Sequence, residues 1–170
     1  MFDESVFLPQ GRKITWIEPQ ALAQRETQAA YAYWRRLRGP RRWPARQEMK
    51  LREAAALLPY MSLVKVIAGG ADFEHRIVGD TMVQAFSVPI QNRRFSDIAA
   101  DAPMLIESSL VLFRKVVALG EPIAWRQRVV RDELRIICVE AEMVLLPFGA
   151  DDDGIDHIAA FGVHNSCPGL

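Results

Sequence analysis

Residues 61–79 read MSLVKVIAGGADFEHRIVG. The first seven residues are mostly apolar and β-branched, and the seven before the closing glycine alternate between charged and uncharged side chains. This alternation is typical of a strand with one buried face. A Gly-Gly pair, which is a turn signal, separates the two runs. The stretch therefore predicts a β-hairpin and the start of an antiparallel sheet.

The rest of the chain supplies helices and three further strands. Short helices are predicted over residues 79–86 and 96–99. A longer helix over 101–119 is apolar around most of its circumference, which indicates burial between two surfaces. The last third predicts strands over residues 122–130, 135–148 and 155–163. Five strands and intervening helices in this order predict an α+β fold and do not suit a doubly wound parallel sheet.

An amphipathic helix is predicted before the hairpin, over residues 19–37. Ala30, Tyr33, Trp34 and Leu37 follow at the spacing of one helix face. This stripe can pack on the chain's own sheet or on a second copy of the molecule. Large aromatic residues often anchor such interfaces, so we expect a homodimer through this helix, with packing on its own sheet as the alternative.

The charge is balanced overall but uneven along the chain. The sequence has 21 basic and 21 acidic residues, which excludes a globally basic or globally acidic protein. Residues 35–52 hold eight arginines and lysines against one glutamate, a local charge of +7. The candidates for contact with an acidic partner are Arg35, Arg36, Arg41 and Arg42. Nucleic-acid binding through the same segment is a less favoured alternative, which would weaken steeply with salt.

Composition indicates a globular protein without a membrane segment. The hydrophobic fraction is 50% and the charged fraction 25%, both ordinary for a folded domain. No apolar run approaches the ~20 residues that span a bilayer, and the acidic start is unlike a signal peptide. Cys138 and Cys167 are too few for a disulfide framework or a zinc site. We expect a cytoplasmic protein with two reduced thiols and no metal.

Five short motifs follow one another along residues 31–164. In chain order they are Trp34 with Leu37-Arg38-Gly39, Pro44-Ala45-Arg46, Leu58-Pro59, Phe73 with Arg76 and Gly79, and Leu146-Pro147. Their order and spacing resemble a family of stand-alone bacterial PAS-domain proteins, in which an N-terminal helix leads through a Pro-x-Arg connector into the core. Two positions depart from that pattern: Lys50-Leu51 replaces an Asp-Pro, and Asn92 replaces a Gly.

The resemblance implies a PAS-like five-stranded antiparallel sheet with intervening helices and an N-terminal flanking helix. The chain then divides into an arm (1–17), a flanking amphipathic helix (18–39), a basic connector with a short helix (40–59), a PAS-like core (60–164) and a tail (165–170).

The resemblance also implies a sensory or interaction module in bacterial signalling. Such a domain acts through contacts with a second copy or with a separate signalling protein, and the pocket between sheet and helices can hold a small ligand. Arg76 and Trp125 could fix a polar group of that ligand. The expected walls are Arg76, Ile77, Phe86, Phe95, Ile98, Leu112, Phe113 and Trp125, with plain core packing as the alternative for each.

Familiar cofactors of PAS domains are disfavoured by residue type. A haem needs an axial ligand, usually histidine, and the predicted helices around the pocket contain none. His75, His157 and His164 all fall on predicted strands or at their ends, with His75 expected as a half-buried core residue. A flavin photosensor needs a cysteine after the second strand, and residues 80–100 contain none. An unidentified small molecule remains.

Nothing in the sequence matches a catalytic motif, so we do not expect an enzyme. There is no H-E-x-x-H, P-loop or G-x-S-x-G pattern. The alternative is an enzyme on a helix-plus-curved-sheet cone, as in ketosteroid-isomerase-like proteins. It would require a buried acid in the pocket, which only Glu140 or Glu142 could supply if their strand face points inward.

Overall fold

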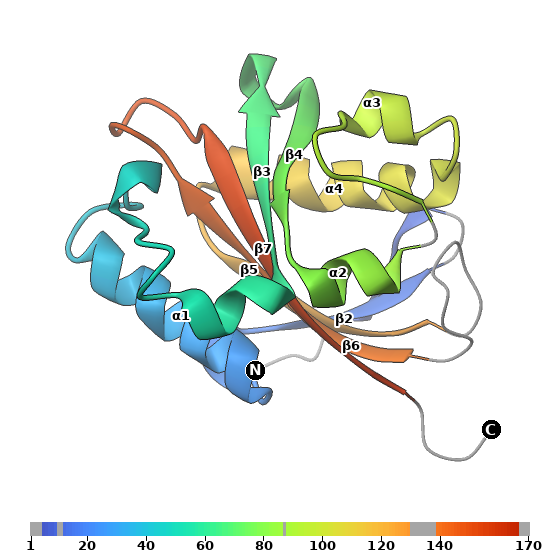
Figure 1. The fold of residues 1–170 in the computed structure, drawn as a ribbon, viewed down its shortest axis with the longest axis horizontal. Helices are drawn as coiled ribbons and strands as arrows, with labels where there is room; N and C mark the ends of the chain where they lie inside the picture. Colours follow the sequence, from blue (N-terminus) through green and yellow to red (C-terminus); the bar gives the residue numbers. More distant parts are fainter. Residues whose placement is uncertain (1–4, 10–11, 87, 130–138, 167–170) are drawn as a thin grey trace.

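The computed structural model describes residues 5–9, 12–86, 88–129 and 139–166. In this part of the chain a single antiparallel sheet has seven strands in the order β1-β2-β5-β6-β7-β3-β4 (Figure 1). The strands are β1 (Ser5–Phe7), β2 (Lys13–Ile17), β3 (Met61–Ile67), β4 (Asp72–Val78), β5 (Ile123–Val129), β6 (Val139–Phe148) and β7 (His157–Ser166). The α-helices are α1 (Arg25–Arg38), α2 (Asp80–Ala85), α3 (Phe95–Ile98) and α4 (Pro103–Leu119).

The α+β class is confirmed, and the predicted hairpin is the pair β3 and β4. The turn between them is a short 3-10 segment, Ala68–Gly70, in which Gly69 and Gly70 take positive φ angles of 66° and 101°. The backbone there needs a conformation that glycine adopts without steric cost. The Gly-Gly pair was therefore a correct turn signal.

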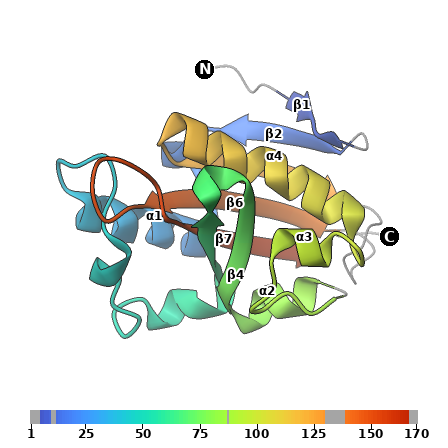
Figure 2. The ribbon, with the colours of Figure 1, turned by 90° about the horizontal axis from the view of Figure 1, so that it is seen from above.

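The predicted strand count of five was wrong, because β1 and β2 add two strands at the β5 edge. Both lie in residues 1–17, which were expected to form only an arm. Ile14 of β2 is fully buried at 0% exposure, and Trp16 packs edge-on against Trp125 with ring centroids 6.3 Å apart. Figure 2 shows β2 alongside α4, whose Lys115 lies over the Trp16 ring.

Both faces of the sheet are covered, and each carries its own apolar core. Leu145 of β6 belongs to the core under α2, α3 and α4, whereas its neighbours Val144 and Leu146 belong to the core under α1. Successive residues of a strand point to opposite faces. The long strands β5, β6 and β7 are thus buried from two sides, with α1 and α4 on opposite faces.

Helix α1 begins later than predicted. Residues Pro19–Ala21 form a separate 3-10 turn, and the α-helix starts at Arg25. It ends at Gly39, whose φ is +57° and whose amide N–H donates to the Arg35 carbonyl. The long helix is confirmed as α4 within two residues of its predicted start, and it ends at Gly120 in the left-handed conformation.

A β-bulge interrupts the β3–β4 pairing. Leu63 pairs with Ile77 and the next residue, Val64, pairs with His75, so Arg76 has no partner opposite it. An extra residue on one strand shifts the inward-outward alternation by one position. Phe73 and Val78 therefore both join the core under α2–α4, while Ile77 packs on the α1 side.

Leu58-Pro59, before β3, and Gly79, after β4, are in direct contact at the open end of this hairpin. A Cβ placed on Gly79 would lie 1.9 Å from the Leu58 carbonyl oxygen and 2.5 Å from that of Pro59. No side chain fits there. The Leu-Pro before β3 and the glycine after β4 are therefore one packing unit.

Some predictions fall on residues outside the described ranges. These are the turn and strand start expected over residues 130–138, the two thiols Cys138 and Cys167, and most of the tail. Within the described ranges, no helix is long and apolar enough to cross a membrane.

Candidate functional site

A cavity of about 80 Å³ lies between the sheet and the helices α2–α4. Residues of strands β3 to β7 line the cavity on the sheet side, and residues of α4 form much of the opposite side. Its apolar walls include Met82, Phe86, Ile90, Phe95, Leu105, Ile106, Leu112, Phe113, Trp125, Met143 and Leu145. Its polar lining comes from Arg12, Ser62, His75, Ser108, Ser109, Gln127 and His164. An apolar enclosure with a few convergent polar groups is the usual form of a small-molecule site.

One polar pair in this lining is already satisfied. Ser62 Oγ and His75 Nδ1 are hydrogen-bonded at 2.7 Å, one on each strand of the β3–β4 hairpin. The His75 ring lies 5.0 Å from that of Phe95, and His75 is 8% exposed. Burial lowers the pKa of His75 to about 4, because charge is costly in an apolar enclosure. The imidazole is neutral at pH 7.

Two other polar groups of the lining have no hydrogen-bond partner among the residues that the structure describes. They are Ser108 Oγ, on the buried face of α4, and His164 Nδ1, on β7. Ser108 is 2% exposed, and burial lowers the pKa of His164 below its ordinary value. A buried polar atom without a hydrogen bond costs about 1–3 kcal/mol. Both atoms belong to the same cavity, so it offers hydrogen bonds to a guest molecule.

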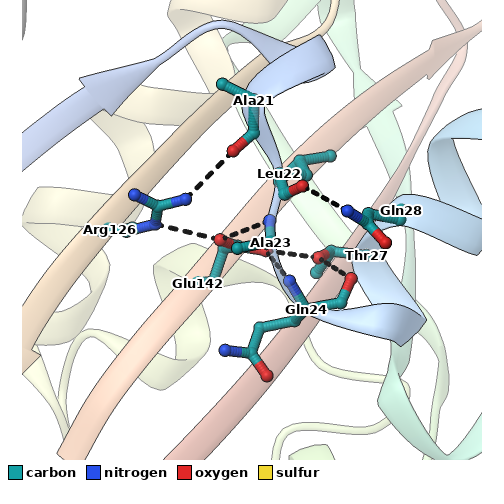
Figure 3. A network of polar contacts seen from close by, with 8 residues as sticks. All are labelled: Ala21, Leu22, Ala23, Gln24, Thr27, Gln28, Arg126 and Glu142. Atoms are coloured by element: carbon teal, nitrogen blue, oxygen red, sulfur yellow. Dashed lines mark hydrogen bonds and ion pairs between the residues drawn. The ribbon is translucent and has the colours of Figure 1, made fainter.

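A second polar cluster, shown in Figure 3, joins the sheet to the start of α1. The carboxylate of Glu142, on β6, accepts hydrogen bonds from the backbone N–H groups of Ala23 at 3.0 Å and Gln24 at 2.9 Å. It also accepts from Thr27 Oγ1 at 2.5 Å and from Arg126 Nε at 3.0 Å. The Glu142 side chain is 3% exposed. A strand residue thus acts as the cap of a helix distant in sequence.

The charge of Glu142 is stabilised by this surrounding. Burial acts to raise the pKa of the carboxyl, but the hydrogen bonds from Thr27, the two backbone amides and Arg126 outweigh it. The net effect holds the pKa of Glu142 below its ordinary value. The carboxylate, not the neutral acid, therefore holds the N-terminus of α1, where the helix dipole also favours negative charge.

The comparison with protein families agrees with this architecture. The family described as PAS domain matches residues 22–163, which include α1, the Glu142 cluster and all of the cavity lining except Arg12 and His164. The chain belongs to this family. PAS domains serve as sensory and interaction modules. No curated protein and no solved structure matches the chain.

In this PAS domain the cavity and the α1 anchor share strands. Met143 lines the cavity, while its neighbour Glu142 holds α1 on the other face of β6. The same holds on β5, where Gln127 lines the cavity and its neighbour Arg126 binds Glu142. The strands β5 and β6 therefore connect the lining of the cavity with the residues that hold α1.

Five of the eight expected pocket residues line the cavity of the PAS domain: Phe86, Phe95, Leu112, Phe113 and Trp125. The other three do not. Ile98 is fully buried in the surrounding core, and the bulge turns Ile77 to the opposite face. Arg76, at the bulge, is exposed and pairs with Glu74 at the surface. The indole N–H of Trp125 donates to Gln127 Oε1 at 3.3 Å.

The sequence reasoning missed the polar lining. Ser108 lies within an apolar stripe of the long helix, between Ile106 and Leu112, and a lone serine there is a usable signal. Ser62 stands among the apolar residues at the start of β3, between Met61 and Leu63. His75 was assigned to the core, which is where it lies, but its contact with the cavity depends on the helices above it.

The apolar stripe of α1 packs on the chain's own sheet, one of the two options that the sequence left open. Ala30 and Trp34 are 1% and 2% exposed. Tyr33 and Leu37 are half-buried against the same core, and the Tyr33 hydroxyl accepts a hydrogen bond from the Lys50 amide at 2.9 Å. Association with a second copy stays a prediction, and it would have to use other faces of α1.

The four candidate arginines are exposed, and each contacts another part of the chain. Arg36 pairs with Glu53 at 3.1 Å and Arg41 with Glu48 at 2.8 Å. Arg35 and Arg42 lie over the rings of Tyr31 and Trp43. Exposed ion pairs contribute little to stability, so these contacts leave the side chains accessible to a partner.

The two glutamates considered for an enzyme do not serve the cavity. Glu140 is exposed, and Glu142 is buried on the opposite face, against α1. The lining of the cavity within the described residues contains no aspartate or glutamate. Neither glutamate is therefore placed as the pocket acid that a ketosteroid-isomerase-like mechanism requires.

The buried state of His75 predicts a pH-dependent stability. Its pKa is about 4 when folded and ~6.5 when unfolded, so only the unfolded chain gains this proton between these values. The neutral, buried His75 therefore contributes about 3 kcal/mol to the unfolding free energy above pH 6.5. This stabilisation is lost as the pH falls from 6.5 to 4.

The measurement is urea-induced unfolding of His75→Asn and the unchanged protein between pH 7 and pH 4. We expect the variant to lose less stability on acidification. His157→Asn, at the half-buried histidine bound to Asp156, is the control for the loss of a histidine elsewhere in the chain. An equal slope in all three proteins would contradict a neutral buried His75.

Proposed function

We propose that this PAS domain is a ligand-sensing module in bacterial signalling, which binds a small molecule in its cavity and acts on another protein by contact. The observation that carries the proposal is the pair of unpartnered polar atoms, Ser108 Oγ and His164 Nδ1, in one apolar enclosure. A purely structural core would favour apolar residues at both positions, since an unsatisfied hydroxyl is costly when buried.

The route from cavity to surface supports a sensing role. Neighbouring residues of β5 and β6 face the cavity on one side and the anchor of α1 on the other. Beside that anchor is an open groove of about 620 Å³ on the outer sheet, lined by residues of both charges, including Lys13, Arg128 and Glu140. This groove and the outer face of α1 are the surfaces on which we place the contact with a partner protein or a second copy.

Native mass spectrometry of the purified protein tests the proposal, with the denatured sample giving the bare chain mass. We expect an additional small mass in the native spectrum. Ser108→Leu is the matched variant, because leucine suits the apolar stripe of α4, fills the cavity and removes the hydroxyl. It should remain folded and lose the added mass.

Two results together would contradict ligand sensing. One is a native mass equal to the bare chain, and the other is the absence of any chemical-shift change when a library of small fragments is titrated into isotope-labelled protein. Sedimentation velocity on the same samples, with and without a fragment that binds, measures whether a second copy associates.

A further inference from the structure

We propose that the cavity selects an uncharged molecule of about four non-hydrogen atoms that carries both a hydrogen-bond donor and an acceptor. This inference rests on the proposed function and specifies the class of its ligand. Its basis is the charge of the lining, the chemistry of the two unpartnered atoms, and the volume of the enclosure.

The lining is almost free of charge. Among the described residues around the cavity, Arg12 is the sole arginine or lysine, and no acidic residue is present. A cation would therefore enter an apolar enclosure without a counter-charge, which is strongly unfavourable. Arg12 already engages another group of the protein, so an anion would have to compete for it.

The two unpartnered atoms fit a molecule with both kinds of hydrogen-bonding group. The Ser108 hydroxyl can donate one hydrogen bond and accept others. A neutral imidazole has one nitrogen that donates and one that accepts, and no group in the described part of the chain fixes the role of His164 Nδ1. A molecule with a carbonyl and an N–H or O–H can exchange hydrogen bonds with either atom, whereas a hydrocarbon would satisfy neither.

The size of the cavity limits the ligand further. An apolar cavity of ~150 Å³ can hold benzene. The 80 Å³ present here therefore suits a molecule about half that size. The walls nearest to this space include Phe86, which is only partly buried, but the other rings are held in the core. Haem and flavin are far larger than the enclosure.

The test uses three probes of nearly equal shape and different charge: acetamide, acetate and the acetamidinium ion. Each is titrated at pH 7.5 into isotope-labelled full-length protein, and amide chemical shifts are followed. We expect acetamide to perturb residues of β7 and α4 with a dissociation constant on the order of 1 mM, as such small ligands allow. The two ions should bind at least tenfold more weakly.

Two adjacent serines provide a matched pair of variants. Ser108→Ala removes the unpartnered hydroxyl and should weaken acetamide binding at least fivefold. Ser109 also lines the cavity, but its hydroxyl already donates to the Leu105 carbonyl at 2.8 Å, so Ser109→Ala should weaken acetamide binding less than Ser108→Ala. Both variants keep α4 intact, because alanine favours helix.

The outcomes separate this inference from the proposed function. Preferential binding of acetate, with loss on Arg12→Gln, would overturn the uncharged class while leaving a ligand-sensing cavity. Preferential binding of acetamidinium would overturn it in the same way. Acetamide binding that is equal in Ser108→Ala and Ser109→Ala would overturn the role of the hydroxyl. Failure of all three probes, together with a bare native mass, would overturn the ligand site itself.

Discussion

A Trp34→Ala variant should lose about 4 kcal/mol of unfolding free energy, the range measured when a large buried side chain is removed. Trp34 is 2% exposed, and its ring stacks on that of Tyr31 at a centroid distance of 6.3 Å. Its indole N–H donates to the Pro147 carbonyl at 2.7 Å. The substitution leaves both a cavity and a buried carbonyl without its donor. Because these contacts lie within the chain, the oligomeric state should not change.

Urea-induced unfolding measures the loss, and sedimentation velocity measures the oligomeric state of the same samples. Trp34→Phe separates the two causes, since it keeps most of the volume but loses the hydrogen bond, and should cost about 1–2 kcal/mol. Dissociation of a dimer by Trp34→Ala without a loss of stability would show that the helix packs on a second copy instead.

The parts of the fold that were predicted correctly are those whose signals are local. The β3–β4 hairpin has its strands and its turn within nineteen consecutive residues. Helix α4 has apolar residues at helical spacing along its whole length and a glycine directly after its last residue, and both signals are local. Strand β2 was missed because its alternation covers five residues, and it becomes a strand through pairing with β5, which is over a hundred residues away. Non-local pairing leaves no local signal.

The apolar walls of the cavity were largely predictable, and its polar lining was not. Large aromatic residues such as Phe95 and Phe113 were expected in any core. The bulge at Arg76 arises from the pairing of β4 with β3, and the sequence of β4 alone does not show it. Regular alternation along β4 therefore predicted Ile77 on the cavity side, whereas it packs on the α1 side. The cavity's hydrogen-bonding character depends on which serines and histidines meet across the core, and their spacing along the chain does not show this.

Glu142 illustrates the same limit. Its position on the strand face opposite to Ala141 and Met143 followed from alternation and is confirmed. Its burial did not follow, because it results from α1 packing on the outer face of the sheet. A glutamate that the sequence offered only as a candidate pocket acid is the anchor of the N-terminal helix.

Glu142→Ala should destabilise the protein by about 4 kcal/mol, as expected when one partner of a buried charged network is removed. The backbone N–H groups of Ala23 and Gln24 would lose their acceptor, and the Thr27 hydroxyl would keep only the Gln24 carbonyl. Arg126 is about half exposed, so water can replace that bond and it adds little to the loss. Glu142→Gln should lower the unfolding free energy nearly as much, because the glutamine NH₂ group would face the N–H donors of Ala23 and Gln24 and could not accept from them.

Glu140→Ala is the matched control. Glu140 lies on the same strand and the same face, two residues away, but is exposed, so its removal should change the unfolding free energy by less than ~0.5 kcal/mol. Hydrogen exchange localises the effect: in Glu142→Ala the amides of α1 should lose protection before those of α4. Similar effects of the two substitutions would contradict the anchoring role.

The lowered pKa of Glu142 adds a pH dependence with a defined sign. The unfolded carboxyl takes up its proton at a higher pH than the folded one. The stabilisation is therefore complete above the unfolded pKa of ~4.3 and is lost as the pH falls through the folded value. Protection factors at the start of α1, which correct for the pH dependence of intrinsic exchange, should fall in acid in the unchanged protein and not in Glu142→Gln. Since Met143 lines the cavity beside this anchor, a guest that shifts β6 should alter exchange at the same amides.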